Sequence, residues 1–218
     1  MYIPKAFELT DLPLLHAAMR KSELALLVSV TANGLVATHL PLLLDENAGP
    51  LGTLHGHVAR ANRQWQDTIP GTEALVIFPG LDTYVSPSWY PAKAETGRVV
   101  PTWNYSAIHA YGIPVFFEDP ERLRGVVTRL TARHEEGFAA PWRVTDAPAN
   151  YIDGQLKAIV GFEIPIARIE GKEKFNQNRS AEDRAGVISA LRASSNERKR
   201  RAADFMEQLE CRRSGEHK

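Results

Sequence analysis

The stretch from residue 24 to residue 58 constrains the fold most, because it reads as consecutive strands joined by tight turns. Residues 24–31 are rich in Leu and Val, and Asn33-Gly34 follows them. This dipeptide is a strong hairpin signal, since both of its residues tolerate positive φ. Residues 35–44 then return as a second strand, and residues 51–58 alternate as a third. Strands connected in this way predict an antiparallel sheet.

The rest of the chain adds more strands and several helices. The expected strands are residues 73–78, 83–86, 106–118 and a closing strand over 159–169. The expected helices are residues 12–19, 59–69, 120–136 and 182–192. About six or seven strands, with helices at the edges, indicate a mainly β chain with helices (α+β) that forms an antiparallel barrel.

Composition excludes several classes of protein. The 218 residues are 44% hydrophobic and 24% charged, which suits one substantial core. Lys+Arg and Asp+Glu number 26 each, so overall basicity gives no argument for nucleic acid. Cys211 is the single cysteine, which fits a reducing cytoplasm. The stretch MYIPKAFELT lacks the basic region and apolar core that a signal peptide has, and no run approaches the length of about 18 apolar residues that a membrane helix needs. A cytoplasmic protein without a membrane span is expected.

Polar side chains gather at the end of the third strand. His55 and His57 lie on one face of that strand, and Arg60 and Asn62 come directly after it. A guanidinium fork and an amide at the point where a strand gives way to a helix suit a phosphate group.

Two other chemistries fit less well. His39, His55 and His57 could converge on a metal, but no carboxylate or cysteine accompanies them at ligand spacing, so no metal site is predicted. The chain lacks the G-x-S-x-G of a serine hydrolase and the glycine-rich motifs of dinucleotide and nucleoside-triphosphate sites. No catalytic residue is predicted.

A long irregular stretch over residues 86–105 is dense in Pro and aromatic residues. A loop of this length in a compact domain is usually functional or disordered, and its aromatic residues argue against disorder. Trp103 and Asn104 offer a π-face beside an amide, so residues 99–105 are expected to form a loop that closes over a ligand.

Several motifs, taken in order, carry a family resemblance. The chain resembles the PaiB family of FMN-binding negative transcriptional regulators from residue 1 to about residue 191. The motifs are MYIPKAF, ATHLPLLL, GTLHGHVARAN, YVSPSWY, VPTWNY followed by IHAYG, GFEIPIARIEGK and KFNQNRSAEDRAGVISAL. Arg63 stands where the family often has Pro, and the segment beyond Ala193 lies outside the resemblance.

The resemblance implies a split barrel of the FMN-binding, pyridoxamine-phosphate-oxidase-like type, a homodimer, and FMN at the dimer interface. It also implies a repressor for which DNA is a family-based partner. FMN needs donors at its phosphate, partners along its ring edge and an apolar face to stack on. The expected cofactor-binding residues are Thr38, His39, His57, Arg60, Asn62, Trp103, Asn104, Lys174 and Gln177.

The resemblance suggests two segments, and the function has an alternative. Residues 1–192 are expected to form the FMN-binding split-barrel domain with helical additions. Residues 193–218 are expected to form a charged C-terminal tail, helical or disordered. The alternative to a regulator is a flavin-dependent oxidoreductase of the pyridoxamine-phosphate-oxidase-like class, or a haem-handling split-barrel protein.

Overall fold

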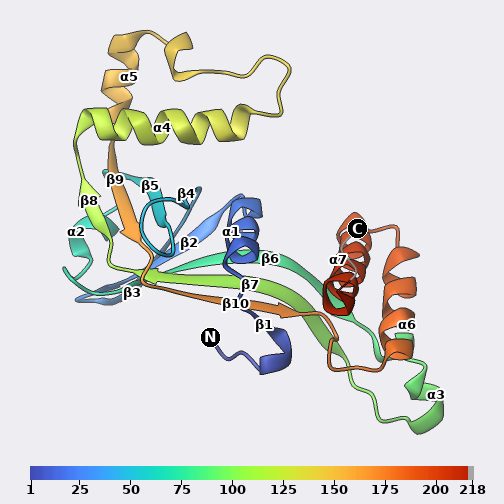
Figure 1. Cartoon of the computed structure of the whole chain (residues 1–218). Helices are drawn as coiled ribbons and strands as arrows, with labels where there is room; N and C mark the ends of the chain where they lie inside the picture. The colour runs from blue at the N-terminus through green and yellow to red at the C-terminus, as the bar shows by residue number, and fades with distance from the viewer. Residues whose placement is uncertain (216–218) are drawn as a thin grey trace. The chain divides into compact units, whose positions relative to one another are not determined.

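The computed structural model describes residues 1–215, which form an α+β fold with two antiparallel sheets (Figure 1). The strands are β1 (Glu8–Leu9), β2 (Ala25–Thr31), β3 (Gly34–Leu40), β4 (Leu43–Asp45), β5 (Thr53–Ala59), β6 (Ala74–Val85), β7 (Thr102–Gly112), β8 (Val115–Phe117), β9 (Ile159–Pro165) and β10 (Arg168–Lys174). The helices are α1 (Leu12–Lys21), α2 (Gln64–Asp67), α3 (Ala92–Thr96), α4 (Pro120–Glu135), α5 (Ala149–Leu156), α6 (Ala181–Arg192) and α7 (Glu197–Ser214), with short 3-10 turns at Lys5–Phe7, Pro87–Trp89 and Val144–Asp146.

The predicted first hairpin is confirmed. Strand β2 pairs with β3 in the antiparallel register that joins Thr31 to Gly34. Gly34 has a φ of 109°, a conformation that only glycine adopts without strain. The turn chemistry of Asn33-Gly34 therefore sets the register of everything that follows along β3, including Thr38 and His39.

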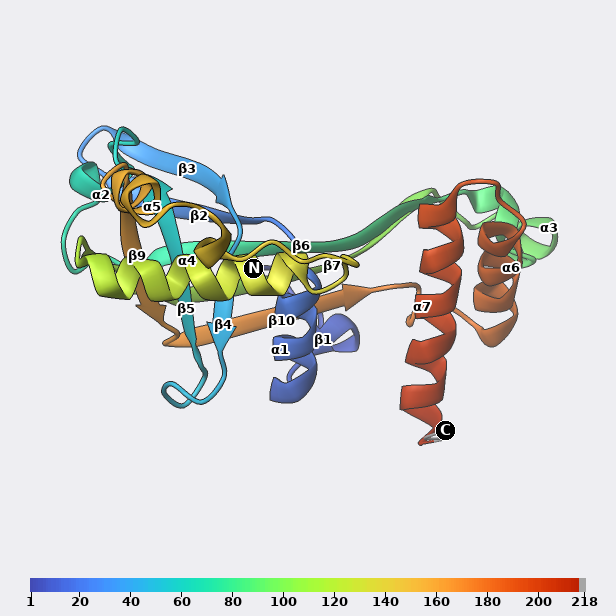
Figure 2. The same cartoon turned by 90° about the horizontal axis from the view of Figure 1, so that it is seen from above.

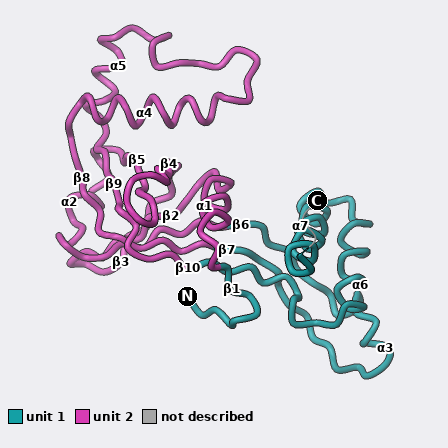
Figure 3. Tube along the Cα trace, viewed as in Figure 1, with its two compact units in different colours: residues 1–9, 80–107, 171–218 teal, residues 10–79, 108–170 magenta. Residues whose placement is uncertain are grey.

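The chain groups into two compact units, shown in different colours in Figure 3. Unit 1 contains residues 1–9, 80–107 and 171–218, and unit 2 contains residues 10–79 and 108–170. Strands β6, β7 and β10 each run from one unit into the other, and the six-stranded sheet has the order β1-β10-β7-β6-β2-β3.

Unit 2 contains the four-stranded sheet, whose order is β4-β5-β9-β8. Helix α4 contacts β4, β5 and β9 and packs against α5 (Figure 1). Leu123 of α4 is fully buried with Ile152 and Leu156 of α5. Asp119 caps α4 by accepting a hydrogen bond from the backbone N–H of Arg122 at 2.8 Å, as its position before Pro120 suggests.

Unit 1 is built around the helix pair α6 and α7, which lie side by side (Figure 2). The apolar positions of α7 recur at helical spacing, so one stripe of Ala202, Ala203, Met206 and Leu209 is buried. Burial of one side chain of the size of Met206 contributes roughly 1.5–3 kcal/mol. Residues 197–214 thus form an ordered helix that completes the core of unit 1.

Several expectations about element boundaries differ from the structure. The described residues form ten strands, not six or seven, because β1, β4 and β8 have only two or three residues and leave no periodic pattern. The expected closing strand over 159–169 is two strands, β9 and β10, separated at Ile166-Ala167. The loop expected over 99–105 ends at Val100-Pro101, and β7 begins at Thr102.

The proposed division at residue 192 stays a prediction, and residues 216–218 of the expected tail lie outside the described residues. Among the helices in residues 1–215, none has the length and the apolar character that a membrane span requires.

Candidate functional site

Three polar side chains of unit 2 form a closed hydrogen-bond cycle. Asn62 Nδ2 donates to Thr38 Oγ1 at 2.8 Å, and Thr38 Oγ1 donates to Gln64 Oε1 at 2.5 Å. The backbone N–H of Gln64 then donates to Asn62 Oδ1 at 3.0 Å. The cycle links β3 to the turn after β5, so two of the predicted residues, Thr38 and Asn62, lie together.

Gln64 fixes this cycle to the sheet, and the sequence analysis missed it. Its side chain is buried, and Nε2 donates to Leu27 O at 3.1 Å and to Ser29 Oγ at 3.0 Å. These contacts hold the amide in one orientation, which in turn orients Thr38. No pattern in the sequence marked Gln64, because α2 is a four-residue helix without periodicity.

Arg60 is braced by the protein itself. Its Nε donates to Lys157 O at 2.7 Å, Nη2 donates to Ile159 O at 3.2 Å, and Nη1 forms an ion pair with Glu118. A guanidinium has five N–H donors, so these three bonds leave part of its donor capacity for a ligand. The bracing fixes the direction in which the remaining donors point.

The predicted histidines lie in different surroundings. His57 on β5 is half-buried, and its Nδ1 is a buried atom without a hydrogen-bond partner in residues 1–215. Burial lowers the pKa of His57, so its neutral form is favoured. His39 on β3 is exposed and lies opposite Leu26 of β2. Within the described part of the chain, no three His, Cys, Asp or Glu side chains group as a metal ion would require.

The four other predicted residues belong to unit 1. Trp103 on β7 is 55% exposed, and its ring meets that of Tyr84 edge-on, with centroids 6.0 Å apart. The next residue, Asn104, is fully buried, with Nδ2 3.6 Å from Met206 Sδ and with Oδ1 unpartnered within residues 1–215. Because side chains alternate along a strand, Trp103 and Asn104 point to opposite faces and do not act on one ligand from the same side.

Lys174 and Gln177 both form hydrogen bonds within unit 1. Lys174 Nζ donates to Thr102 Oγ1 at 2.7 Å and to Trp103 O at 2.8 Å, and burial lowers its pKa. Gln177 accepts from the backbone N–H of Phe175 at 2.6 Å and donates to Glu173 O at 2.5 Å. Both ends of the Gln177 amide are therefore engaged in closing the turn after β10.

The nine predicted residues thus fall into two groups. Unit 2 holds Thr38, His39, His57, Arg60 and Asn62, and unit 1 holds Trp103, Asn104, Lys174 and Gln177. The structure brings together Thr38 and Asn62 in the first group, and Trp103 and Lys174 in the second.

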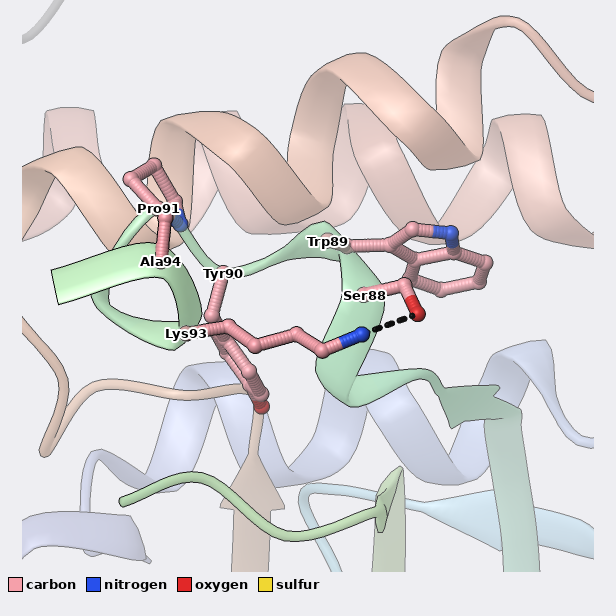
Figure 4. Close-up of a pocket in the computed structure, with 6 residues that line it drawn as sticks. All are labelled: Ser88, Trp89, Tyr90, Pro91, Lys93 and Ala94. Carbon is pink, nitrogen blue, oxygen red and sulfur yellow. Dashed lines mark hydrogen bonds between the residues drawn. The ribbon is translucent and has the colours of Figure 1, made fainter. Parts of the chain in front are cut away.

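A shallow pocket of about 500 Å³ lies in unit 1, at the turn that precedes α3 (Figure 4). Its lining residues include Trp89, Tyr90 and Lys93, and Lys93 Nζ donates to Ser88 Oγ at 3.2 Å. Burial raises the pKa of Tyr90, whose hydroxyl accepts a hydrogen bond from Asn176 Nδ2 at 2.7 Å. None of the nine predicted residues lines this pocket.

Comparison with known proteins gives the family. Residues 1–168 match the FMN_bind_2 family, described as "Putative FMN-binding domain". The chain belongs to the FMN_bind_2 family. It is 31% identical to the "Protease synthase and sporulation protein PAI 2" of Bacillus subtilis, over 95% of this chain and 97% of that protein. It is also 33% identical to an Aspergillus fumigatus protein, over 88% of this chain and 90% of the other. The predicted PaiB resemblance is confirmed.

Solved structures support the same fold at much lower sequence identity. The FAD and haem binding protein of Mycobacterium smegmatis has a TM-score of 0.58 at 17% identity, over 82% of this chain and 78% of that chain. The flavocytochrome Anf3 of Azotobacter vinelandii has a TM-score of 0.55 at 15% identity, over 84% of this chain and 78% of that chain. The predicted fold class, an α+β antiparallel split barrel, is confirmed for this FMN_bind_2 member.

Proposed function

We propose that the protein binds FMN and acts as a PaiB-like negative transcriptional regulator. The observation that carries the FMN proposal is the family match over residues 1–168, which includes the whole Thr38–Asn62–Gln64 cycle, Arg60 and His57. Thr38 lies within ATHLPLLL and Asn62 ends GTLHGHVARAN, two of the motifs that carry the resemblance.

The unit 2 residues fit the chemistry of a flavin phosphate and ring edge. Arg60 keeps unused N–H donors, Asn62 supplies an amide, and His57 Nδ1 is a buried nitrogen that lacks a partner in residues 1–215. Buried polar atoms rarely remain unpaired, so a ligand atom that bonds to His57 would account for this one. When bound, FMN supplies a redox-active ring, and these residues supply its orientation and its charge compensation.

We also propose a homodimer in which both chains complete the cofactor site. Strand β3 is an edge strand of its sheet, and five of its first six residues are exposed. Leu35 is 74% exposed, and Val30 and Val36 beside it are also exposed apolar residues. An exposed, apolar edge strand is a liability unless another surface covers it, and a second copy of the chain is the partner we propose.

We propose the regulator role and the DNA partner from the PaiB resemblance and the PAI 2 relative. The basic run over residues 198–201 lies in α7. Arg198 pairs with Asp82, and Arg200 donates to the carbonyl of Ser194 at 2.9 Å, so part of this run is used within the protein. We propose a cytoplasmic location, because the single cysteine, Cys211, is a free thiol and fits a reducing compartment.

An oxidoreductase or a haem protein is the second candidate, favoured by the flavin and haem named for the M. smegmatis and A. vinelandii structures. An absorbance spectrum of the purified protein, recorded before and after addition of FMN, separates these functions. We expect flavin bands that gain vibronic structure on binding. A Soret band would support the haem function, and bleaching of the flavin by reduced nicotinamide without oxygen would support the oxidoreductase. A spectrum unchanged by the protein would contradict the FMN proposal.

A further inference from the structure

Two lysines of β10 present their ammonium groups on one face of unit 1. Lys172 and Lys174 are two positions apart on the strand, so their side chains point to the same side, about 7 Å apart at the backbone. Lys172 Nζ donates to Tyr2 O at 3.0 Å, and Lys174 Nζ donates to Thr102 Oγ1 and Trp103 O. All of these acceptors are neutral oxygens.

Within residues 1–215, neither of these two lysines forms an ion pair. Lys172 is only 6% exposed, and within residues 1–215 no ion pair joins Lys172 or Lys174 to a carboxylate. Glu8 lies opposite Lys172 in the β1–β10 register but is exposed. The charge of Lys172 also lowers the pKa of Lys174, after the larger effect of burial. A buried cation without a counter-charge is costly, so such a pair is typical of a site that receives an anion.

Aromatic rings border the same lysines. The Lys172 ammonium lies 4.9 Å from the centroid of the Tyr105 ring and 5.6 Å from that of Tyr2. Tyr105 and Trp103 share one face of β7 by strand alternation, and Trp103 keeps more than half of its surface exposed. An exposed indole beside a cation pair offers a stacking surface next to an anion site.

We propose that Lys172 and Lys174, with Trp103 and Tyr105, bind the phosphate and the ring of a mononucleotide, a phosphate monoester that carries an aromatic base. The lysines hold the phosphate as point charges, and Trp103 stacks on the ring. The source of the phosphate is FMN or a separate nucleotide. If it is FMN, the inference rests on the proposed function, and the two lysines take the place of Arg60 as the phosphate contact. If it is a separate nucleotide, the inference does not rest on the proposed function, and Arg60 keeps that contact.

Two matched ligand pairs distinguish the sources. FMN and riboflavin differ only in the phosphate, as do adenosine monophosphate and adenosine. Binding of each to the full-length apoprotein is measured by flavin fluorescence or calorimetry. We expect Lys172→Met and Lys174→Met each to weaken a phosphate-bearing ligand about tenfold or more, from the strength of charge-assisted hydrogen bonds, and to leave its dephosphorylated partner unchanged.

The pair that responds identifies the source of the phosphate. Failure of FMN to bind the wild-type protein would overturn the proposed function but leave the adenine pair as a test of the lysines. Lys199→Met is the matched control, because Lys199 also lies near an aromatic ring of unit 1, 5.7 Å from that of Trp89. Lys199→Met should leave the affinity for all four ligands unchanged.

Folding is monitored by the melting temperature, and Lys172→Arg and Lys174→Arg should retain most of the affinity in folded protein. The proposal is overturned if wild-type protein binds neither phosphate ligand, or if both lysine-to-methionine variants bind them as tightly as wild type. Equal losses for phosphorylated and dephosphorylated ligands would also overturn it.

Discussion

Asn62 Nδ2 and Thr38 Oγ1 lie 2.8 Å apart, and this hydrogen bond ties the turn after β5 to the middle of β3. The Thr38 hydroxyl also donates to Gln64, so one oxygen serves two amides. Thr38→Val removes this hydroxyl and leaves the Gln64 Oε1 without its donor, which costs roughly 1–3 kcal/mol of unfolding free energy. Chemical denaturation should show this loss, and FMN affinity should fall with it. Thr38→Ser keeps the hydroxyl and should retain most of both; equal stability of the Val and Ser variants would contradict the role of the cycle.

Arg60→Ala should weaken FMN about tenfold or more, because a charge-assisted contact to phosphate contributes roughly 1.5–3 kcal/mol. Titration of apoprotein by flavin fluorescence measures this. The ion pair with Glu118 provides the control, since Glu118→Gln breaks the same pair but keeps the guanidinium. If Glu118→Gln lowers FMN affinity as much as Arg60→Ala does, the affinity depends on the Arg60–Glu118 ion pair and not on a contact of Arg60 with the phosphate. Arg60→Lys should retain only part of the FMN affinity, because an ammonium group lacks the planar, two-pronged donor geometry of a guanidinium.

Trp103→Leu tests whether the indole stacks on a ligand. Since Trp103 is 55% exposed, its replacement should hardly change the melting temperature of the apoprotein. FMN affinity per folded molecule should nevertheless fall. Trp142 of unit 2 is 44% exposed and is the matched control, so Trp142→Leu should leave affinity intact. Unchanged FMN binding by the Trp103 variant would remove this residue from the flavin site.

Leu35→Asp should convert the proposed dimer to a monomer. The side chain is exposed in the single chain, so a charge there costs little in the monomer but is unfavourable within an apolar interface. Light scattering at micromolar concentration measures the mass. Val100 of unit 1 is also exposed, and Val100→Asp serves as a control that should remain dimeric. A wild-type protein with a monomer mass would rule out the dimer.

The buried His57 predicts a pH dependence of stability. Burial holds its pKa in the folded protein below the ordinary value of 6.5, so the unfolded chain takes up a proton first as the pH falls. The contribution to the unfolding free energy is complete above pH 6.5 and is lost as the pH falls toward the lower folded pKa. Burial also lowers the pKa values of His55 and His109, so they contribute in the same direction.

Denaturation at a series of pH values between 7.5 and 5, roughly the range in which histidines titrate, measures this dependence. His57→Gln should reduce the slope, whereas His134→Gln, on an exposed part of α4, should not. A slope that does not change in the His57 variant would show that the loss comes from other groups.

The features that the sequence predicted well are local. The β2–β3 hairpin follows from the conformational freedom of Asn33-Gly34, and the start of α4 follows from Asp119-Pro120, so each is decided within a few residues. The position of Trp103 was harder to predict, because the surrounding Pro and aromatic residues suggest a loop. Pairing with neighbouring strands of the sheet makes it part of β7.

The candidate site depended on contacts that are distant in sequence. Gln64 joins Thr38 across 26 positions, and the Lys174 contact with Thr102 spans 72. Lys172 lies two positions before Lys174, a spacing that places both side chains on one face of a strand. This was not predicted, because the closing strand was expected to end at residue 169. Spacing along the chain cannot show such pairs unless the strand order is known.

The two units interleave along the chain, and this has a consequence for synthesis on the ribosome. All residues of unit 2 have been synthesised once position 170 has emerged. Unit 1 can fold only later, because residues 1–9 and 80–107 pack with residues from position 171 onward. Until α7 appears, the apolar side chains of Val85, Tyr90 and Phe175 lack the helix that covers them in the finished protein. The nascent chain therefore exposes an incomplete apolar core until α7 has emerged, and this is the interval in which a chaperone that holds unfolded chains would have most to bind.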